Sequence, residues 1–171
     1  MAAIVPLRAA DLAADLDQLA DLLIDGVASG ASISFLPPLG RDEASAYWQG
    51  LAGSLEDGSR IMLAARLADR IVGSVQLELA MRANGSHRAE VQKLIVHTSM
   101  QRQGLGRRLL IALEQQALAA GRSLLVLDTR QGDPSELLYQ GQGYVLAGAI
   151  PAYARSANGD LHATVFYYKL I

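Results

Sequence analysis

The apolar residues of this chain follow two different spacings, and each spacing predicts one kind of secondary structure. Leu12, Leu16, Leu19 and Leu23 recur every three or four residues, which predicts an amphipathic helix over residues 11–27. Such a helix buries one apolar face against the rest of the protein and leaves its polar face in water.

Alternation of apolar and polar residues predicts a strand over residues 71–81. It places Ile71, Leu77 and Met81 on one face and Gln76 on the other. The strand predicted over residues 61–67 precedes it after a short turn, so the two are expected to pair antiparallel.

The same reasoning over the whole chain predicts strands and helices in mixed order. The predicted strands cover residues 4–8, 61–67, 71–81, 89–96, 124–127, 143–150 and 162–170. The predicted helices cover residues 11–27, 42–55, 105–120 and 134–140. Antiparallel pairs come first and a strand–helix–strand unit follows, which indicates an α/β fold on one mixed sheet. The length of 171 residues predicts a single domain over residues 1–171.

The alternation breaks inside the strand predicted over residues 89–96. Val91 fits one phase, whereas Leu94 and Val96 fit the opposite phase. A β-bulge near Gln92 and Lys93 would reconcile the two phases, because it inserts one extra residue into the strand.

Composition and charge narrow the class of protein. Hydrophobic residues make up 51% of the chain, which predicts a globular protein. The net charge of −2 gives no general attraction to nucleic acid or to an anionic membrane. The chain has no cysteine, which excludes disulfides and thiolate nucleophiles. The N-terminus does not read as a signal peptide, and the longest uncharged stretch is interrupted by glycine and proline. We therefore expect a cytoplasmic protein with no membrane and no nucleic-acid partner.

A glycine-containing loop lies between the strand ending near residue 96 and the helix starting at residue 105. It reads Gln-Arg-Gln-Gly-Leu-Gly over residues 101–106. The free N–H groups and the positive end of the following helix would bind a phosphate or pyrophosphate there. An ordinary tight turn and a dinucleotide-binding loop are the alternatives. A dinucleotide loop would follow the first strand and carry a third glycine, where Leu109 stands here.

This loop resembles the pyrophosphate loop of the GCN5-related N-acetyltransferases (GNAT family). Residues 137–144, Leu-Leu-Tyr-Gln-Gly-Gln-Gly-Tyr, resemble the helix-then-strand segment near the end of that family's fold. The resemblance implies acetyl-CoA as co-substrate, a bulged strand splayed from its neighbour, and helices on both faces of the sheet. The residues that it implies at the cofactor are Leu94, Ile95, Val96, Arg102, Gln103, Gly104, Leu105, Gly106 and Arg107. Arg108 is a further candidate at the phosphates. For each arginine the alternative is a solvated charge at the start of a helix.

A narrower resemblance, over most of the chain, is to the tabtoxin-resistance acetyltransferases of plant-pathogenic pseudomonads. It is carried by residues 30–35, 88–94, 127–129, 150–154, 160–164 and 167–169. Those enzymes acetylate an amine of a small, amino acid-like β-lactam toxin, so the implied partner is a small-molecule amine.

The narrower resemblance also implies roles for individual residues. Glu90 and Asp128 match the carboxylates proposed to accept the amine proton, and the GNAT pattern makes Tyr139 the group that protonates the leaving thiolate. Ser32, Ser34 and Phe35 would wall the acceptor pocket. The alternatives are a salt-bridged strand residue for Glu90, a turn residue for Asp128 and a tyrosine at the edge of the core for Tyr139.

The remaining candidates are weaker. His87, His97 and His162 lack the spacing of a metal site, so we expect no metal. Trp48 is expected to pack a helix, with a lid over the substrate as the alternative. The contacting asparagine of many GNAT members is replaced by Asp133 followed by proline, so we assign no cofactor contact there.

The sequence therefore predicts direct acetyl transfer to the amine of a small amino acid-like molecule. Two rivals stay open. One is the same fold acting on a protein N-terminus or lysine, and the other is a non-catalytic acyl-CoA sensor. A hairpin at residues 153–160 that closes the acceptor cleft would favour small molecules. The resemblance to this family also implies a homodimer.

Overall fold

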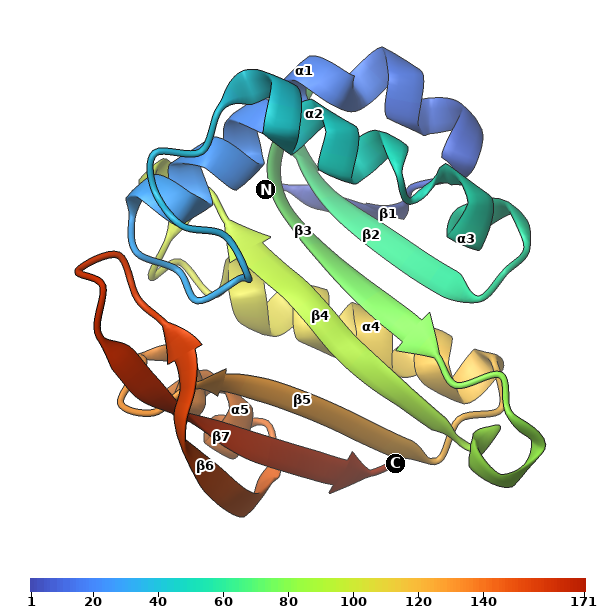
Figure 1. The fold of residues 1–171 in the computed structure, drawn as a ribbon. Coiled ribbons are helices and arrows are strands. Elements are labelled where there is room, and N and C mark those ends of the chain that lie inside the picture. The colour runs from blue at the N-terminus through green and yellow to red at the C-terminus, as the bar shows by residue number, and fades with distance from the viewer.

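Seven strands form one sheet in the order β1-β2-β3-β4-β5-β7-β6 in the computed structural model, which describes every residue from 1 to 171 (Figure 1). The strands are β1 (Ala3–Pro6), β2 (Arg60–Leu67), β3 (Arg70–Leu79), β4 (Arg88–Val96), β5 (Leu124–Arg130), β6 (Val145–Arg155) and β7 (Leu161–Leu170). β4 and β5 are parallel, whereas the other neighbouring pairs are antiparallel. The sheet is therefore mixed, as predicted.

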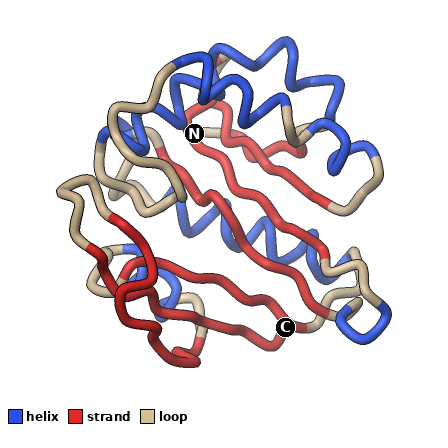
Figure 2. The backbone as a smooth tube through the Cα atoms, viewed as in Figure 1, coloured by secondary structure: helices blue, strands red, loops and turns tan.

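Helices cover both faces of this sheet, which confirms the expected fold class (Figures 1 and 2). They are α1 (Ala9–Ala28), α2 (Arg41–Gln49), α3 (Ala52–Glu56), α4 (Leu105–Ala119) and α5 (Ser135–Gly141). Short 3₁₀ turns cover Ala83–Gly85 and Thr98–Met100. No helix is both long and apolar enough to span a bilayer.

Each face of the sheet carries its own hydrophobic core. α1 and α2 pack on one face through residues such as Leu19, Leu23 and Trp48. α4 packs on the other face, where Leu109 and Leu113 are fully buried. The leucines at helical spacing are thus the residues that position the helices, as their periodicity predicts.

Three expectations about individual elements are wrong. The single helix predicted over residues 42–55 is two helices, because the glycine at position 50 weakens the helix and the N–H of Leu51 bonds to Trp48 in a tighter turn. Ile71 lies on the α1 face rather than with Leu77, because the β2–β3 register shifts by one residue beside it. Met81 lies beyond the end of β3 and is exposed.

β4 separates from β5 soon after both strands begin. The two strands pair only between Arg88–Glu90 and Leu124–Val126. The register between β4 and β3 then shifts, and Lys93 adopts a φ of 50°. This confirms the bulge predicted near Gln92 and Lys93. Because β4 stays with β3 and turns away from β5, the sheet opens at its centre (Figure 2).

The β6–β7 hairpin reaches toward the loop between α1 and α2. Arg130, at the end of β5, donates hydrogen bonds to the carbonyl of Gly30 at 3.3 Å and to the hydroxyl of Ser156 at 3.4 Å. One side chain thus joins the loop and the hairpin above the opening in the sheet.

Candidate active site

A groove of about 520 Å³ lies at the opening between β4 and β5. Its walls come from β4, the glycine-containing loop, the start of α4, and α5. Of the predicted cofactor residues, eight line it: Leu94, Ile95, Val96, Arg102, Gly104, Leu105, Gly106 and Arg107. Gln103 does not, and its side-chain amide donates to the carbonyl of Ser99 at 3.2 Å. The side chain of Ile95 is buried in the α1-side core.

The start of α4 has the features of an anion site. Gly104 precedes the helix with a φ of 77°, a conformation that favours glycine, and no side chain caps the helix. The first-turn N–H groups therefore have no partner within the helix. A Cβ atom on Gly106 would lie 3.4 Å from Leu138 and 3.7 Å from Val96. Glycine keeps the groove open at that point.

Two of the nearby arginines line the groove and the third does not. Arg102 and Arg107 are at its wall, whereas Arg108 donates to the carbonyl of Ala2 at 2.6 Å. Arg108 thus anchors the N-terminal strand, and its assignment to the phosphates is wrong.

A second cavity, of about 190 Å³, adjoins the groove. Glu90, Asp128, Ser32 and Ser34 all line it, although they come from three segments far apart in the chain. Tyr139 lines both this cavity and the groove. The three predicted catalytic residues thus line one cavity, and Tyr139 alone among them also lines the groove.

Asp128 lies within β5 rather than in a turn, and its carboxylate has no ion-pair partner within 4.0 Å. Asp128 is exposed on its strand, but partial desolvation of its carboxylate raises its pKa, the nearby Glu90 carboxylate raises it further, and Lys93 opposes both effects. A carboxylate with a raised pKa and free oxygens is suited to accept a proton.

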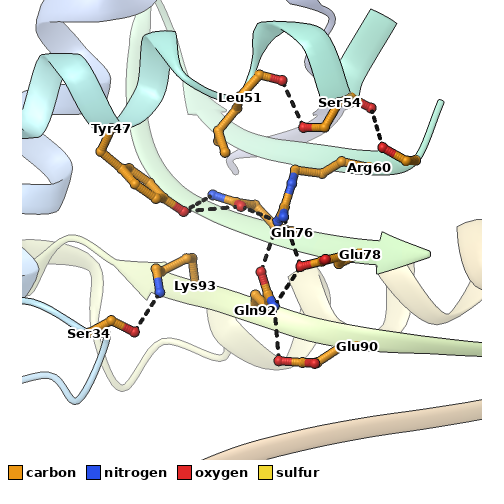
Figure 3. A network of polar contacts seen from close by, with 11 residues as sticks. Ser34, Tyr47, Leu51, Ser54, Arg60, Gln76, Glu78, Glu90, Gln92 and Lys93 are labelled. Atoms are coloured by element: carbon orange, nitrogen blue, oxygen red, sulfur yellow. Dashed lines mark hydrogen bonds and ion pairs between the residues drawn. The ribbon is translucent and has the colours of Figure 1, made fainter. Parts of the chain in front are cut away.

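Glu90 is held by an amide rather than by an ion pair (Figure 3). Gln92 donates to Glu90 and to Glu78, at 2.9 Å in each case. Arg60 donates to the amide oxygen of Gln92 at 2.9 Å and pairs with Glu78 at 2.9 Å. Arg60 therefore forms its ion pair with Glu78, and Glu90 lines the cavity without a cationic partner.

Tyr139 is 7% exposed, and burial raises its pKa above the ordinary value for tyrosine. Its hydroxyl therefore keeps its proton at neutral pH and can act as a donor. The ring also packs beside Tyr144, with 5.9 Å between centroids. Tyr139 therefore lies at the edge of the core and at the groove at the same time, so the two interpretations of this residue do not exclude each other.

Phe35 and Trp48, the remaining candidates, pack against neighbouring side chains and line neither the groove nor the cavity. Phe35 packs edge-on against Tyr47 at 5.2 Å and lines a neighbouring cavity between its own loop and the β6–β7 hairpin. Trp48 is fully buried and donates to the carbonyl of Leu19 at 2.8 Å, which excludes a lid. No group of histidine and acidic side chains is arranged to hold a metal ion.

Comparison with known proteins identifies the fold and the chemistry together. Residues 30–144 match the acetyltransferase (GNAT) family. An uncharacterised N-acetyltransferase from the hisH–hisA intergenic region of Azospirillum brasilense is 34% identical over 119 residues, which cover 68% of this chain and 69% of that protein. The chain belongs to the GNAT acetyltransferase family. The acetyltransferases of this family use acetyl-CoA as co-substrate.

Solved structures share this acetyltransferase's fold at low sequence identity. A ribosomal-protein-alanine N-acetyltransferase from Brucella melitensis is 21% identical, with a TM-score of 0.80 and 99% of both chains covered. An acetyltransferase from Salmonella typhimurium, solved with acetyl-CoA, is 19% identical, with a TM-score of 0.78 over 99% of this chain and 94% of that one. The glycine loop and the groove that follows β4 fit a cofactor with a pyrophosphate and an extended arm.

Sequence reasoning missed three side chains that shape this acetyltransferase's site. Gln92 positions Glu90, Arg130 joins the loop to the hairpin, and Lys93 lies in the cavity with the carboxylates. One signal was present for Lys93, because the chain has only two lysines and one of them falls on the predicted bulge.

Replacing Tyr139 with Phe is expected to lower kcat by on the order of 10-fold. This loss is smaller than is usual for a general acid, because a thiolate can leave with little help from a proton donor. Steady-state kinetics of CoA release would measure this. Tyr144→Phe is the matched control, since Tyr144 is also buried but lines neither space. Equal losses in both variants would contradict an acid role for Tyr139.

Proposed function

We propose that this enzyme transfers the acetyl group of acetyl-CoA directly to the amine of a small amino acid-like molecule. One observation carries the proposal. Two carboxylates without cationic partners line a small cavity together with a protonated tyrosine, and that tyrosine also lines the adjoining cofactor-sized groove. In this proposal Leu94, Val96 and the loop at residues 101–107 hold acetyl-CoA, and residues 1–171 act as one catalytic domain.

The proposed reaction needs a neutral amine and a protonated leaving group. Asp128 or Glu90 accepts a proton from the substrate ammonium, either directly or through water. The amine nitrogen then forms a bond to the acetyl carbon, and the bond from that carbon to sulfur breaks. The thiolate takes a proton from Tyr139, the second amine proton leaves to a carboxylate, and Tyr139 regains its proton from that carboxylate through water. No cysteine exists to carry the acetyl group, which favours transfer within a ternary complex.

The dimensions of the cavity favour a small acceptor. Its volume is about 190 Å³, and the loop that carries Ser32 and Ser34 forms one of its walls. Arg130 ties that loop to the β6–β7 hairpin. We infer an acceptor of amino acid size, met in the cytoplasm, and a β-lactam toxin such as tabtoxin is one member of that class. Homodimer formation is an expectation that size-exclusion chromatography with light scattering can test.

A peptide or protein amine is the second candidate acceptor. The Brucella melitensis enzyme of similar fold is named for an alanine of a ribosomal protein. The predicted closure by the hairpin at residues 153–160 is not found, because no hairpin residue lines this cavity, and the small volume of the cavity is what argues against a peptide chain there. A non-catalytic sensor would not need two unpaired carboxylates beside the groove.

The pH dependence of kcat/KM is expected to report Asp128. Its pKa is raised, so the carboxylate form and the activity are lost as pH falls through that raised pKa. Glu90→Gln removes a like charge and should move this acidic limb to lower pH. Lys93→Met removes an opposing charge and should move the limb to higher pH. Profiles of kcat/KM against pH, measured with one acceptor, would test both predicted shifts. An acidic limb that stays at the same pH in both variants would exclude Asp128 as the group whose titration causes it.

The experiment that tests the proposed function is CoA-thiol release across matched acceptor classes. The panel contains L-amino acids, tabtoxinine-β-lactam, an aminoglycoside and peptides with free N-termini. We expect turnover of amino acid-like acceptors with a free amine. Turnover of peptides alone would move the enzyme to protein modification. Tight acetyl-CoA binding with no turnover in any class would favour the sensor.

A further inference from the structure

The cavity beside the cofactor groove carries both signs of charge. Glu90 and Asp128 line it from β4 and β5, and Lys93 lines it from the bulge of β4. Lys93 does not line the groove. The positive group is therefore on the acceptor's side of the site, away from the loop expected to hold the pyrophosphate.

Lys93 is held in place by neutral groups. Its ammonium donates to the hydroxyl of Ser34 at 2.9 Å (Figure 3). It also lies 5.9 Å and 5.8 Å from the ring centroids of Phe35 and Tyr47. The rings attract the cation and restrict the side chain without neutralising it.

Lys93 has donors left to use. An ammonium group has three N–H donors, and the Ser34 hydroxyl accepts one of them. No carboxylate lies within 4.0 Å of it, although the electrostatic influence of both Asp128 and Glu90 reaches it. By contrast, Lys169, the chain's other lysine, is paired with Glu114 at 2.7 Å.

The separation of these charges matches one class of molecule. We propose that Lys93 and Ser34 form a carboxylate-binding subsite, so that the acceptor is a zwitterionic α-amino acid whose ammonium faces Asp128 and Glu90. An acceptor's carboxylate takes the free donors of Lys93, and its ammonium lies beside the two carboxylates. This inference rests on the proposed function, because it names the acceptor class for the same cavity.

The bulge of β4 carries the residues that hold both sides of the proposed site. The extra residue in β4 gives Lys93 its φ of 50°, and the Lys93 side chain reaches Ser34 in the loop between α1 and α2. Gln92, the preceding residue, bonds to Glu90. Adjacent residues at the bulge thus support the proposed amine side and the proposed carboxylate side of one cavity.

Binding to Lys93 can be observed apart from catalysis, because the chain has only two lysines. Protein labelled with ¹³C-lysine gives one Cε signal for Lys93 and one for Lys169. The probes are L-alanine, L-methionine, L-glutamine and tabtoxinine-β-lactam, each compared with its α-carboxamide, which keeps the amine. We expect at least one acid to shift the Lys93 signal and its carboxamide to leave it unchanged. The Lys169 signal, assigned through Lys169→Arg, serves as the internal control.

Kinetics supply the second arm of the test. Lys93→Met should raise KM about 10- to 100-fold for the acid form of an acceptor, because a charge-assisted hydrogen bond is lost. It should change KM little for the carboxamide, and Lys93→Arg should recover part of the preference for the acid. Lys169→Arg should keep the wild-type values for both forms.

The outcomes separate this inference from the proposed function. Equal losses for acid and carboxamide in Lys93→Met would overturn the subsite and leave the acetylation of small amines standing. A Lys93 signal that no acid moves would also overturn it. A signal that acids move in an enzyme that turns over none of them would support the subsite while the proposed function fails.

Discussion

Replacing Asp128 with Asn is expected to lower kcat about 100- to 10,000-fold, the range typical of removing a general base. The substitution keeps the size of the side chain and removes the free carboxylate that the proposed mechanism needs. Glu90→Gln should cause a loss of the same kind, because both carboxylates line one cavity. Since they serve the same proton, the double variant should lose less than the product of the two single losses.

The affinity for acetyl-CoA separates this role from a structural one. Asp128 does not line the cofactor groove, so the Kd for acetyl-CoA measured by calorimetry should stay close to the wild-type value. Asp17→Asn is the matched control, because the Asp17 side chain is 93% exposed on α1. Loss of acetyl-CoA binding in Asp128→Asn, with turnover of the bound complex unchanged, would contradict the assignment.

Replacing Gly106 with Leu is expected to weaken acetyl-CoA binding by at least about 100-fold. The Cβ atom alone would lie 3.4 Å from Leu138, so the rest of the leucine would fill the groove between β4 and α5. It would also keep an anion from approaching the first N–H groups of α4. Leucine favours helices more than glycine does, so the fold itself should not lose stability through propensity.

A matched glycine variant and a melting curve complete this test. Gly53 lies in α3, and a Cβ atom there would meet nothing within 4 Å. Gly53→Leu should therefore bind acetyl-CoA like the wild type, and both variants should melt near the wild-type Tm. Normal acetyl-CoA affinity in Gly106→Leu would show that the cofactor does not use this groove.

Local patterns predicted the elements of this fold well. The bulge of β4 followed from the change of phase between Val91 and Leu94, since a strand cannot otherwise turn both residues toward a core. The glycine loop before α4 followed from backbone chemistry that depends on neighbouring residues alone. Resemblance to the GNAT family added the splayed strand, which no local pattern contains.

The contacts between distant segments were beyond such patterns. Lys93 meets Ser34 across 59 positions of sequence, and Arg108 meets Ala2 across 106. Neither spacing has a periodicity that could indicate the pairing. Ile71 was placed on the wrong face because the register shift depends on the partner strand β2 as well as on its own strand.

The most direct test of the central claim is the initial rate of CoA release, measured while acetyl-CoA and an amino acid acceptor are varied together, with mass spectrometry of the product. Direct transfer in a ternary complex predicts intersecting double-reciprocal lines and an N-acetyl amino acid as product, both lost in the Asp128→Asn variant. Parallel lines, or acetylation confined to peptides, would contradict the account.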